Sequence, residues 1–307
     1  MDYSDKIDAE TWAFIKRTDT YYPPDAVNLS IADQRRVYDD MCRAFFQGYP
    51  DGVTARDIHV GDVPCRLYET GTPSVTVMYF HGGGFVVGGL DSHDDVCAEI
   101  CERTGYRVLS VDYRMAPEHK HPAAYDDCRA ATEYAARTWD DPVVLAGDSA
   151  GGNLAAAVAH MARETDLPIV GQVLIYPGLG GDWTQGSYIT HAEAPLLTTR
   201  DIEFYKGVRC EDGQEPVGDP TYAPLHDSDF SALPPTIIIS AECDPLSDDG
   251  REYRDALRAA GVRALWVNES GLVHGYLRAR ATVARARDSF TRIVNAIADL
   301  GRGDFPR

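Results

Sequence analysis

The sequence has no apolar run long enough to cross a membrane. A helix needs about 20 consecutive apolar residues to span the hydrocarbon core of a bilayer, and no stretch of the 307 residues approaches that length. The opening segment, Met1 to Lys6, also lacks the basic and apolar regions of a secretory signal peptide. These absences exclude a transmembrane helix, and we expect a cytoplasmic protein without stable membrane association.

Positive charge is also scarce. Lysine and arginine together number 29, against 48 aspartates and glutamates, which gives a formal net charge of -19 at pH 7. No cluster of basic residues is present that would neutralise phosphates. We therefore expect neither nucleic acid nor an anionic membrane surface as a partner, and we interpret the acidity as a solvated surface.

Cysteine is present, but without the pattern of a disulfide framework or a zinc site. The number is odd, and no further cysteine or histidine pair completes a set of zinc ligands with Cys97 and Cys101. We predict buried free thiols, no metal and no cofactor. The seven cysteines are Cys42, Cys65, Cys97, Cys101, Cys128, Cys210 and Cys243.

Strand and helix patterns alternate through most of the chain. The alternation is typical of an α/β fold with a mostly parallel sheet and helices on both faces. Residues 53–60 and 63–68, joined through Gly61-Asp62, predict an antiparallel hairpin at the start of the sheet. Ser92 and Asp95 predict a capping box for the helix that follows them. The later strands are predicted at 74–80, 106–111, 142–146, 169–175, 235–241 and 264–267, and the helices at 93–104, 123–138, 154–163, 248–260 and 282–300.

Ser149 stands in a Gly-x-Ser-x-Gly pattern between a predicted strand and a predicted helix. A serine on such a sharp turn is typical of a nucleophile elbow, in which Gly147 and Gly151 leave room for the backbone. The pattern alone is equally compatible with a glycine-rich turn that carries a solvent-facing serine. A base, an acid and an oxyanion hole elsewhere in the chain decide between the two interpretations.

Three consecutive glycines follow the predicted strand that ends at Phe80. Consecutive glycines lose much conformational entropy on folding, and they are useful where backbone N–H groups must approach a ligand closely. We assign Gly83 and Gly84, together with the N–H of Ala150, as an oxyanion hole. A flexible surface loop is the alternative. His81, just before the glycines, is expected to support this loop rather than to act as a base.

The candidate base is His274, one of nine histidines. It follows the last predicted strand and precedes the last predicted helix, where a loop at the carboxyl edge of the sheet reaches Ser149. Because an imidazole must be neutral to accept a proton, this role predicts that activity falls in acid. His119 and His121 precede the elbow, and His160 falls within the elbow helix, so they fit this role poorly.

The candidate acid follows the strand predicted at 235–241, where the choice is among Glu242, Asp244, Asp248 and Asp249. Asp244 lies just beyond the strand, and Pro245 fixes the turn. Asp248 and Asp249 stand where a helix begins and favour its positive end. We assign Asp244 as the residue that orients His274, with Asp248 as the second choice or as an additional support.

Two segments interrupt the alternation and predict a helical cap. Residues 1–48 and 178–215 carry helical patterns, and we expect them to cover a catalytic core made of 49–177 and 216–307. Ordinary packing of these helices against the sheet is the alternative. The apolar residues that we expect to shape a substrate pocket are Phe85, Trp183, Tyr188, Leu196, Phe204, Tyr205 and Tyr276, although each is also compatible with cap or core packing.

Five motifs in this order make the chain resemble the hormone-sensitive-lipase-like family of α/β-hydrolase carboxylesterases. The resemblance covers nearly the whole chain, and only Met115 and Tyr276 replace the more usual leucine and phenylalanine. It implies an α/β-hydrolase core with a cap, a structural corner at Asp112-Tyr113-Arg114, and hydrolysis of esters of short- or medium-chain acids. The motifs are His81-Gly82-Gly83-Gly84-Phe85, Asp112-Tyr113-Arg114-Met115-Ala116-Pro117-Glu118-His119, Gly147-Asp148-Ser149-Ala150-Gly151-Gly152, Asp244-Pro245-Leu246 and His274-Gly275-Tyr276.

Other activities use the same side chains. An amidase, a peptidase or a thioesterase can employ this serine, histidine and aspartate, and a metal hydrolase fits the pattern least. A binding protein of this fold is the alternative that is not an enzyme, but the related plant hormone receptors have lost the histidine that this chain keeps as His274. The expected partner is a small-molecule ester, and the sequence is compatible with a homodimer.

Overall fold

A central sheet of eight strands organises the protein in the computed structural model, which describes residues 1–23 and 26–306. The strand order is β1-β2-β4-β3-β5-β6-β7-β8. The first two strands form the predicted antiparallel hairpin, β2 also pairs antiparallel with β4, and all later pairs are parallel. The α/β class is therefore confirmed. The strands are β1 Thr54–Val60, β2 Val63–Glu69, β3 Thr76–Phe80, β4 Arg107–Val111, β5 Val143–Asp148, β6 Ile169–Ile175, β7 Thr236–Cys243 and β8 Ala264–Val273.

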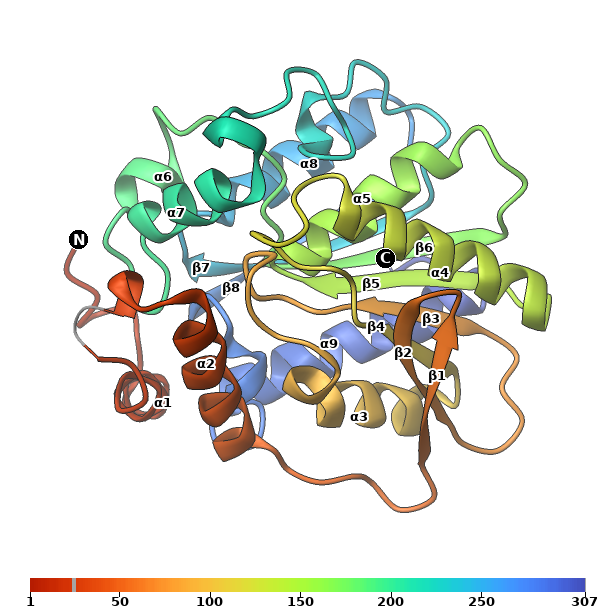
Figure 1. Ribbon diagram of the computed structural model, residues 1–307, viewed down its shortest axis with the longest axis horizontal. Coiled ribbons are helices and arrows are strands. Elements are labelled where there is room, and N and C mark those ends of the chain that lie inside the picture. Colours follow the sequence, from red (N-terminus) through yellow and green to blue (C-terminus); the bar gives the residue numbers. More distant parts are fainter. Residues whose placement is uncertain (24–25, 307) are drawn as a thin grey trace.

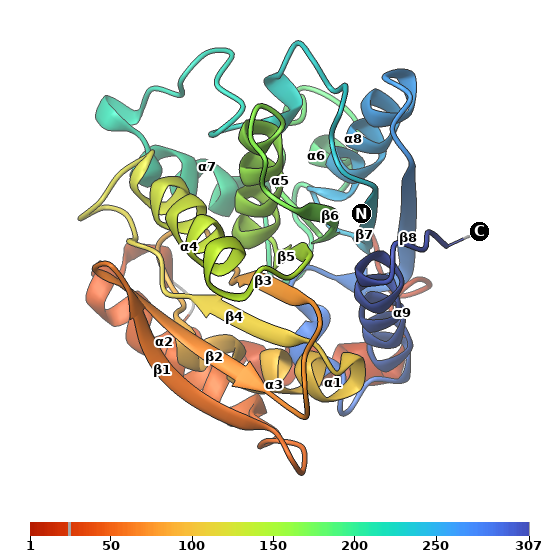
Figure 2. The same cartoon turned by 90° about the vertical axis from the view of Figure 1, so that its right-hand side faces the viewer.

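Helices cover both faces of the sheet (Figure 2). On one side α4, α5 and α8 pack on it, and on the other side α3 and α9 do. This arrangement buries the central strands on both faces, which explains why β3, β4 and β5 are mostly apolar and show no alternation of buried and exposed positions. The helices are α1 Ala9–Asp19, α2 Ile31–Phe45, α3 Asp94–Thr104, α4 Ala123–Trp139, α5 Ala150–Ala162, α6 Ser187–Thr190, α7 Thr199–Arg209, α8 Ser247–Ala259 and α9 Ala284–Gly301.

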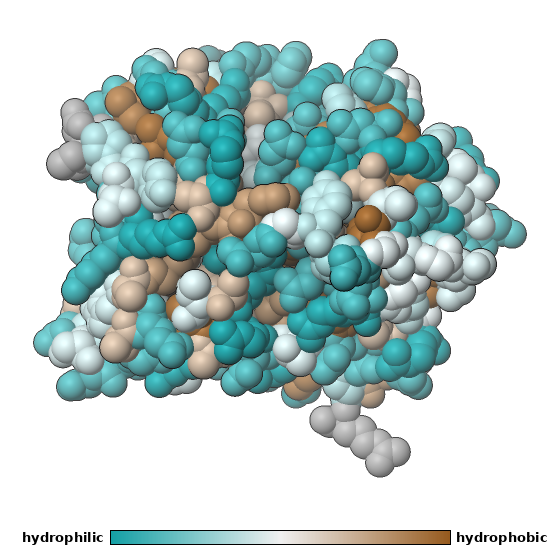
Figure 3. Space-filling view, turned by 90° about the horizontal axis from the view of Figure 1, so that it is seen from below, coloured by the Kyte–Doolittle hydropathy of each residue, from teal (hydrophilic) through white to brown (hydrophobic). Residues whose placement is uncertain are grey.

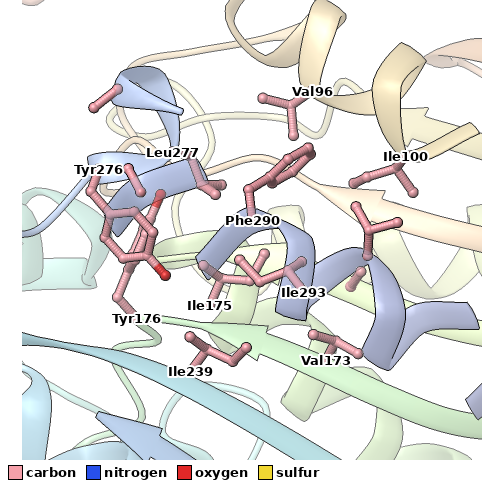
Figure 4. Packing of buried hydrophobic residues seen from close by; sticks show 14 of the residues in the cluster. Val96, Ile100, Val173, Ile175, Tyr176, Ile239, Tyr276, Leu277, Phe290 and Ile293 are labelled. Carbon is pink, nitrogen blue, oxygen red and sulfur yellow. The ribbon is translucent and has the colours of Figure 1, made fainter. Parts of the chain in front are cut away.

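The core on the α9 side is a stack of three layers. Phe290 and Ile293 of α9 lie between the sheet and α3, with Ile175 below them and Val96 and Ile100 above (Figure 4). All five side chains are almost completely buried. Such burial of branched and aromatic side chains is the main favourable term in folding.

Four helices gather at the carboxyl ends of the parallel strands. α1 and α2 come from the first 48 residues, and α6 and α7 come from the insertion after β6 (Figure 1). The N-terminal segment is tied to the end of the chain: Asp8 forms an ion pair with Arg285 at 2.9 Å, and the N–H of Ala284 donates to Glu10 at 2.7 Å. Lys6 also pairs with Glu242. The boundaries of a separate cap stay a prediction.

Two local predictions need correction. The capping box of Ser92 and Asp95 does not form, because Ser92 closes a short 3-10 turn onto Gly89, and Asp95 instead accepts the N–H of Gln47 and pairs with Arg280. The strand predicted at 264–267 continues to Val273, and its pairing with β7 carries an irregularity between Ala241 and Cys243.

The face seen from below is mainly hydrophilic, with hydrophobic side chains gathered near its centre and in smaller areas elsewhere (Figure 3). All seven cysteines are buried and free. Among the described residues, no helix combines the length and the apolar character needed to cross a bilayer, and no three side chains are grouped as a metal site would require.

The contact between α5 and β3 gives the first testable prediction. A methyl group at Gly151 would lie 1.8 Å from the carbonyl oxygen of Phe80, which is a backbone atom that cannot move aside cheaply. Gly151→Ala is therefore expected to lower the free energy of unfolding by about 3 kcal/mol or more. Urea unfolding followed by circular dichroism measures this change.

Gly207→Ala is the matched control. Gly207 lies inside α7 with open space around its Cα, so alanine there should leave stability unchanged or raise it by about 1 kcal/mol through better helix propensity. Equal stability of the two variants would contradict the packing argument.

Candidate active site

Ser149 occupies the turn between β5 and α5. Its backbone has φ 55° and ψ -116°, a conformation that is unfavourable for a residue with a side chain. Its N–H donates to the carbonyl of Ile175 at 2.8 Å, which holds the turn against the neighbouring strand β6. Its carbonyl accepts the N–H of Asn153 at 3.1 Å, the first hydrogen bond of α5, so this strained residue joins the strand directly to the helix.

His274 and Asp244 lie at the ends of the two neighbouring strands, β8 and β7. Nε2 of His274 is 2.8 Å from Oγ of Ser149, and Nδ1 is 2.7 Å from Oδ2 of Asp244. The Asp244 side chain is fully buried, and its other oxygen accepts the N–H of Leu246 at 2.9 Å. The three groups form a continuous chain of hydrogen bonds, along which the imidazole can accept the serine proton while the carboxylate orients the ring.

The glycine loop after β3 lies beside the serine. Gly83 and Gly84 have φ values of 130° and 61°, which glycine adopts readily, and both line the same cavity as Ser149 and Ala150. A Cβ at Gly83 would lie 2.0 Å from the carbonyl oxygen of Val87. The three residues predicted as an oxyanion hole are therefore brought together next to the serine hydroxyl.

Asp148 joins this loop to the elbow, and the sequence reasoning missed its role. One carboxylate oxygen accepts hydrogen bonds from the hydroxyl of Tyr79 and the N–H of Gly82, both at 2.9 Å. The other contacts Nε2 of His93 at 3.2 Å and the hydroxyl of Tyr176 at 3.3 Å. Burial acts to raise the pKa of Asp148, but His93 and these hydrogen bonds lower it below the usual range. The sequence signal that could have indicated this role is a charged residue, Asp148, directly before Ser149.

His81 lies beneath the glycine loop. It is fully buried, stacks on the ring of Tyr113 at 4.3 Å, and its backbone carbonyl accepts a hydrogen bond from the Tyr113 hydroxyl at 2.7 Å. Burial, with the nearby His93, lowers the pKa of His81 to about 4, so the ring is neutral near pH 7. These contacts favour the supporting role predicted for it.

The competing acids have other partners. Glu242 accepts the N–H of Gly271 at 2.8 Å and pairs with Lys6. Asp248 accepts the N–H of Ser187 at 2.9 Å. Oδ2 of Asp249 accepts the N–H of Leu179 at 2.6 Å and those of Gly180 and Gly181 at 3.2 and 3.3 Å. Asp248 and Asp249 therefore bind the segment after β6 rather than His274.

A cavity of about 400 Å³ opens over the serine. Its lining is mostly apolar and contains Ser149, His274 and residues from both segments of the predicted cap. Six of the seven predicted pocket residues line it: Phe85, Trp183, Tyr188, Leu196, Phe204 and Tyr205. Sequence reasoning missed the contribution of the N-terminal helices, because Phe14, Thr18, Val37, Tyr38 and Met41 belong to no motif.

Tyr276 is the predicted pocket residue that does not line the cavity. It is fully buried, its hydroxyl shares a hydrogen bond of 2.7 Å with Ser289, and its ring meets that of Tyr176 edge to face at 5.1 Å (Figure 4). The ring packs in the core although His274, two residues earlier, faces the cavity. Proximity in sequence to the histidine was therefore misleading.

Comparison with known proteins gives one family. The profile of a family described as having the α/β hydrolase fold matches residues 77–278. Carboxylesterase NlhH of Mycobacterium tuberculosis is 39% identical over 265 residues, which cover 81% of this chain and 80% of that protein. An ethyl acetate hydrolase of Pseudomonas putida is 33% identical over 80% of each chain. The crystal structure of a hyperthermophilic esterase from Pyrobaculum calidifontis superposes with a TM-score of 0.85 at 29% identity, covering 95% of this chain and 98% of that one.

The buried carboxyl of Asp249 gives a prediction for the pH dependence of stability. Burial raises its pKa from 3.8 to about 7, so the folded protein keeps the proton over a pH range in which the unfolded chain releases it. The wild type therefore loses stability from this group as the pH rises from about 4 to 7, whereas Asp249→Asn does not. Urea unfolding should show the variant gaining about 3 kcal/mol relative to wild type between about pH 5 and pH 8.

Asp288→Asn, at an exposed position of α9, is the control for this measurement. Its stability relative to wild type should change little over the same interval. A difference between Asp249→Asn and wild type that stays constant with pH would show that Asp249 is ionised in the folded protein throughout.

Proposed function

Since the chain belongs to the hormone-sensitive-lipase-like carboxylesterases of the α/β hydrolase fold, we propose that it cleaves esters of short- to medium-chain acids through an acyl-enzyme on Ser149. That it is a carboxylic ester hydrolase follows from its relatives. The roles of individual residues, the covalent intermediate and the chain length are the proposal.

The first half of the reaction transfers the acyl group to the enzyme. His274 accepts the proton of the Ser149 hydroxyl while Oγ attacks the ester carbonyl. The N–H groups of Gly83, Gly84 and Ala150 donate hydrogen bonds to the oxyanion that develops on the carbonyl oxygen. The protonated imidazole then gives its proton to the departing alkoxide, and the alcohol leaves.

The second half uses water in place of serine. His274 takes a proton from a water molecule, the hydroxide attacks the acyl-enzyme, and the proton returns to Oγ of Ser149 as the acid is released. Asp244 holds the imidazole in the tautomer that presents Nε2 to the serine and stabilises the ring when it is charged. The acyl group thus leaves with the hydroxyl of the water as the free acid, and the other proton of the water restores the Ser149 hydroxyl.

One observation carries the proposal. The hydrogen bonds of 2.8 Å and 2.7 Å connect Ser149, His274 and Asp244 in series, at the floor of a cavity that also contains the two loop glycines. A turn with a merely solvent-facing serine has no reason to combine a strained backbone, an imidazole and a fully buried carboxylate in this geometry.

Variants of the three side chains test the mechanism. With 4-nitrophenyl butyrate as substrate, Ser149→Ala is expected to lower kcat by about 10⁵-fold or more. Asp244→Asn should lower it by about 10³- to 10⁴-fold, because the amide favours the wrong imidazole tautomer. Asp248→Asn, which alters a neighbouring carboxylate, should stay within about threefold of wild type, and circular dichroism checks the folding of each variant. Hydrolysis that survives in folded Ser149→Ala would refute the nucleophile.

The size of the cavity leads to a prediction about acyl chains. A cavity of about 400 Å³ is in the range of small-molecule sites and accommodates acyl groups of limited length. Across 4-nitrophenyl esters, kcat/KM should be highest for acyl groups of about four to eight carbons and at least tenfold lower for palmitate. A profile that keeps rising to palmitate would instead indicate a lipase that acts on long chains.

A further inference from the structure

The cavity over Ser149 contains a buried cation that the proposed reaction does not use. Arg209 is the last residue of α7, is 6% exposed and lines the cavity. Its guanidinium lies against two aromatic rings, 3.6 Å from the ring centre of Phe85 and 4.2 Å from that of Tyr222. Because the side chain is buried against these rings, its charge is poorly hydrated.

No carboxylate of the described residues contacts this guanidinium. Among the described residues the guanidinium forms no salt bridge, and its two hydrogen bonds go to uncharged groups, the carbonyl of Tyr222 at 3.1 Å and the side-chain oxygen of Asn153 at 3.3 Å. Burial lowers the pKa of Arg209 to about 10, which leaves it protonated at neutral pH. Asp219, the nearby acid, is bound to His121 at 3.1 Å.

Arg209 differs from the other buried arginines. The buried arginines of the described residues are Arg107, Arg209 and Arg280, and both Arg107 and Arg280 contact a carboxylate. Lys206, which also lines the cavity, pairs with Glu215. Arg209 is therefore the one buried arginine of the described chain whose guanidinium contacts no carboxylate.

A guanidinium has five N–H donors, and the two hydrogen bonds of Arg209 to the described residues leave the other donors available to a ligand. Its Nε has no hydrogen-bond partner among the described residues and is not among the fully buried polar atoms that lack one, and the residue lines the cavity. A second arginine, Arg278, lines the same cavity next to the His274 loop, where it hydrogen-bonds to Tyr38 and forms no salt bridge with the described residues. Asp148 interacts favourably with Arg278, and Asp19 and Asp201 also line the cavity, so the preference for negative charge in the bound molecule is local to Arg209.

We propose that this site takes esters that carry a carboxylate, with Arg209 as the residue that binds it. The substrate class is a half-ester of a dicarboxylic acid, or an ester of an alcohol or phenol that bears a carboxylate. Hydrolysis consumes one water and gives two products, one of which is a dicarboxylate or a hydroxycarboxylate. The proposal rests on the esterase function above and specifies its substrate.

Two matched pairs of esters test the proposal. On the acyl side, mono(4-nitrophenyl) glutarate is compared with 4-nitrophenyl 5-methylhexanoate, in which an isopropyl group replaces the carboxylate. On the alcohol side, 4-carboxyphenyl acetate is compared with 4-acetylphenyl acetate. The measured quantity is the ratio of kcat/KM for the charged ester to that for the neutral one, after subtraction of the non-enzymatic rate.

Arg209→Met should lower this ratio by about tenfold or more in one pair, since a hydrogen bond between charged groups is lost. The pair that responds shows which side of the ester carries the carboxylate. Arg209→Gln removes the charge but keeps donors for Tyr222 and Asn153, and it serves if the methionine variant does not fold. Arg209→Lys keeps the charge and should retain a higher charged-to-neutral ratio of kcat/KM than either Arg209→Met or Arg209→Gln.

Arg200→Met is the matched control, because it removes the same charge from an exposed position of α7 outside the cavity. Its ratios should stay at the wild-type values. Unchanged ratios in folded Arg209→Met or Arg209→Gln, with neutral esters still hydrolysed, would overturn the proposal and leave the esterase function intact. Wild-type ratios below about one tenth in both pairs would also overturn it, whereas failure to hydrolyse any ester would overturn the esterase function itself.

Discussion

The active site depends on the hydrogen bonds to one carboxylate, that of Asp148. Its two oxygens connect the strand that carries the nucleophile to the glycine loop, through Gly82, and to His93 at the start of α3. Ser149 and the two loop glycines come from segments 66 residues apart, and the roles proposed for them require a fixed relative position. A buried charge satisfied on both oxygens makes that position stiff, because any displacement leaves a charged group without partners in a medium of low polarity.

The protein combines an acidic exterior with a cavity in which acidic and basic side chains are mixed. The net charge of -19 disfavours the approach of an anion from a distance, whereas Arg209 favours an anion that has reached it in the cavity. A charged substrate would then be selected by short-range interactions inside the cavity, and its association with the protein would be slower. Added salt screens the repulsion by the exterior more than the attraction inside the cavity, because the exterior charges lie in water and the cavity charges do not.

Sequence reasoning reached the elements with strong local signals. The elbow, the glycine loop and the positions of Asp244 and His274 follow from motifs at strand ends, and the parallel strands follow from uninterrupted apolar runs. It failed where tertiary packing decides. Tyr276 is buried in the core, and Asp95 pairs with Arg280 and does not cap the helix as predicted. The side chains of α1 and α2 that line the cavity belong to an ordinary amphipathic pattern, which carries no signal for a pocket. Arg209 belongs to no motif, and only burial without a counter-ion distinguishes it.

The ties between the N-terminal segment and α9 have a consequence for the order in which the protein is assembled during synthesis. α1 leaves the ribosome early, but Arg285 and Ala284, which bind Asp8 and Glu10, are made about 275 residues later. At typical elongation rates of about 5–20 residues per second, these ties can form only some tens of seconds after α1 has been made, whereas Phe14 meets its neighbour Phe45 of α2 much sooner. The part of the cavity wall that α1 supplies is thus fixed to the core only after α9 has been synthesised.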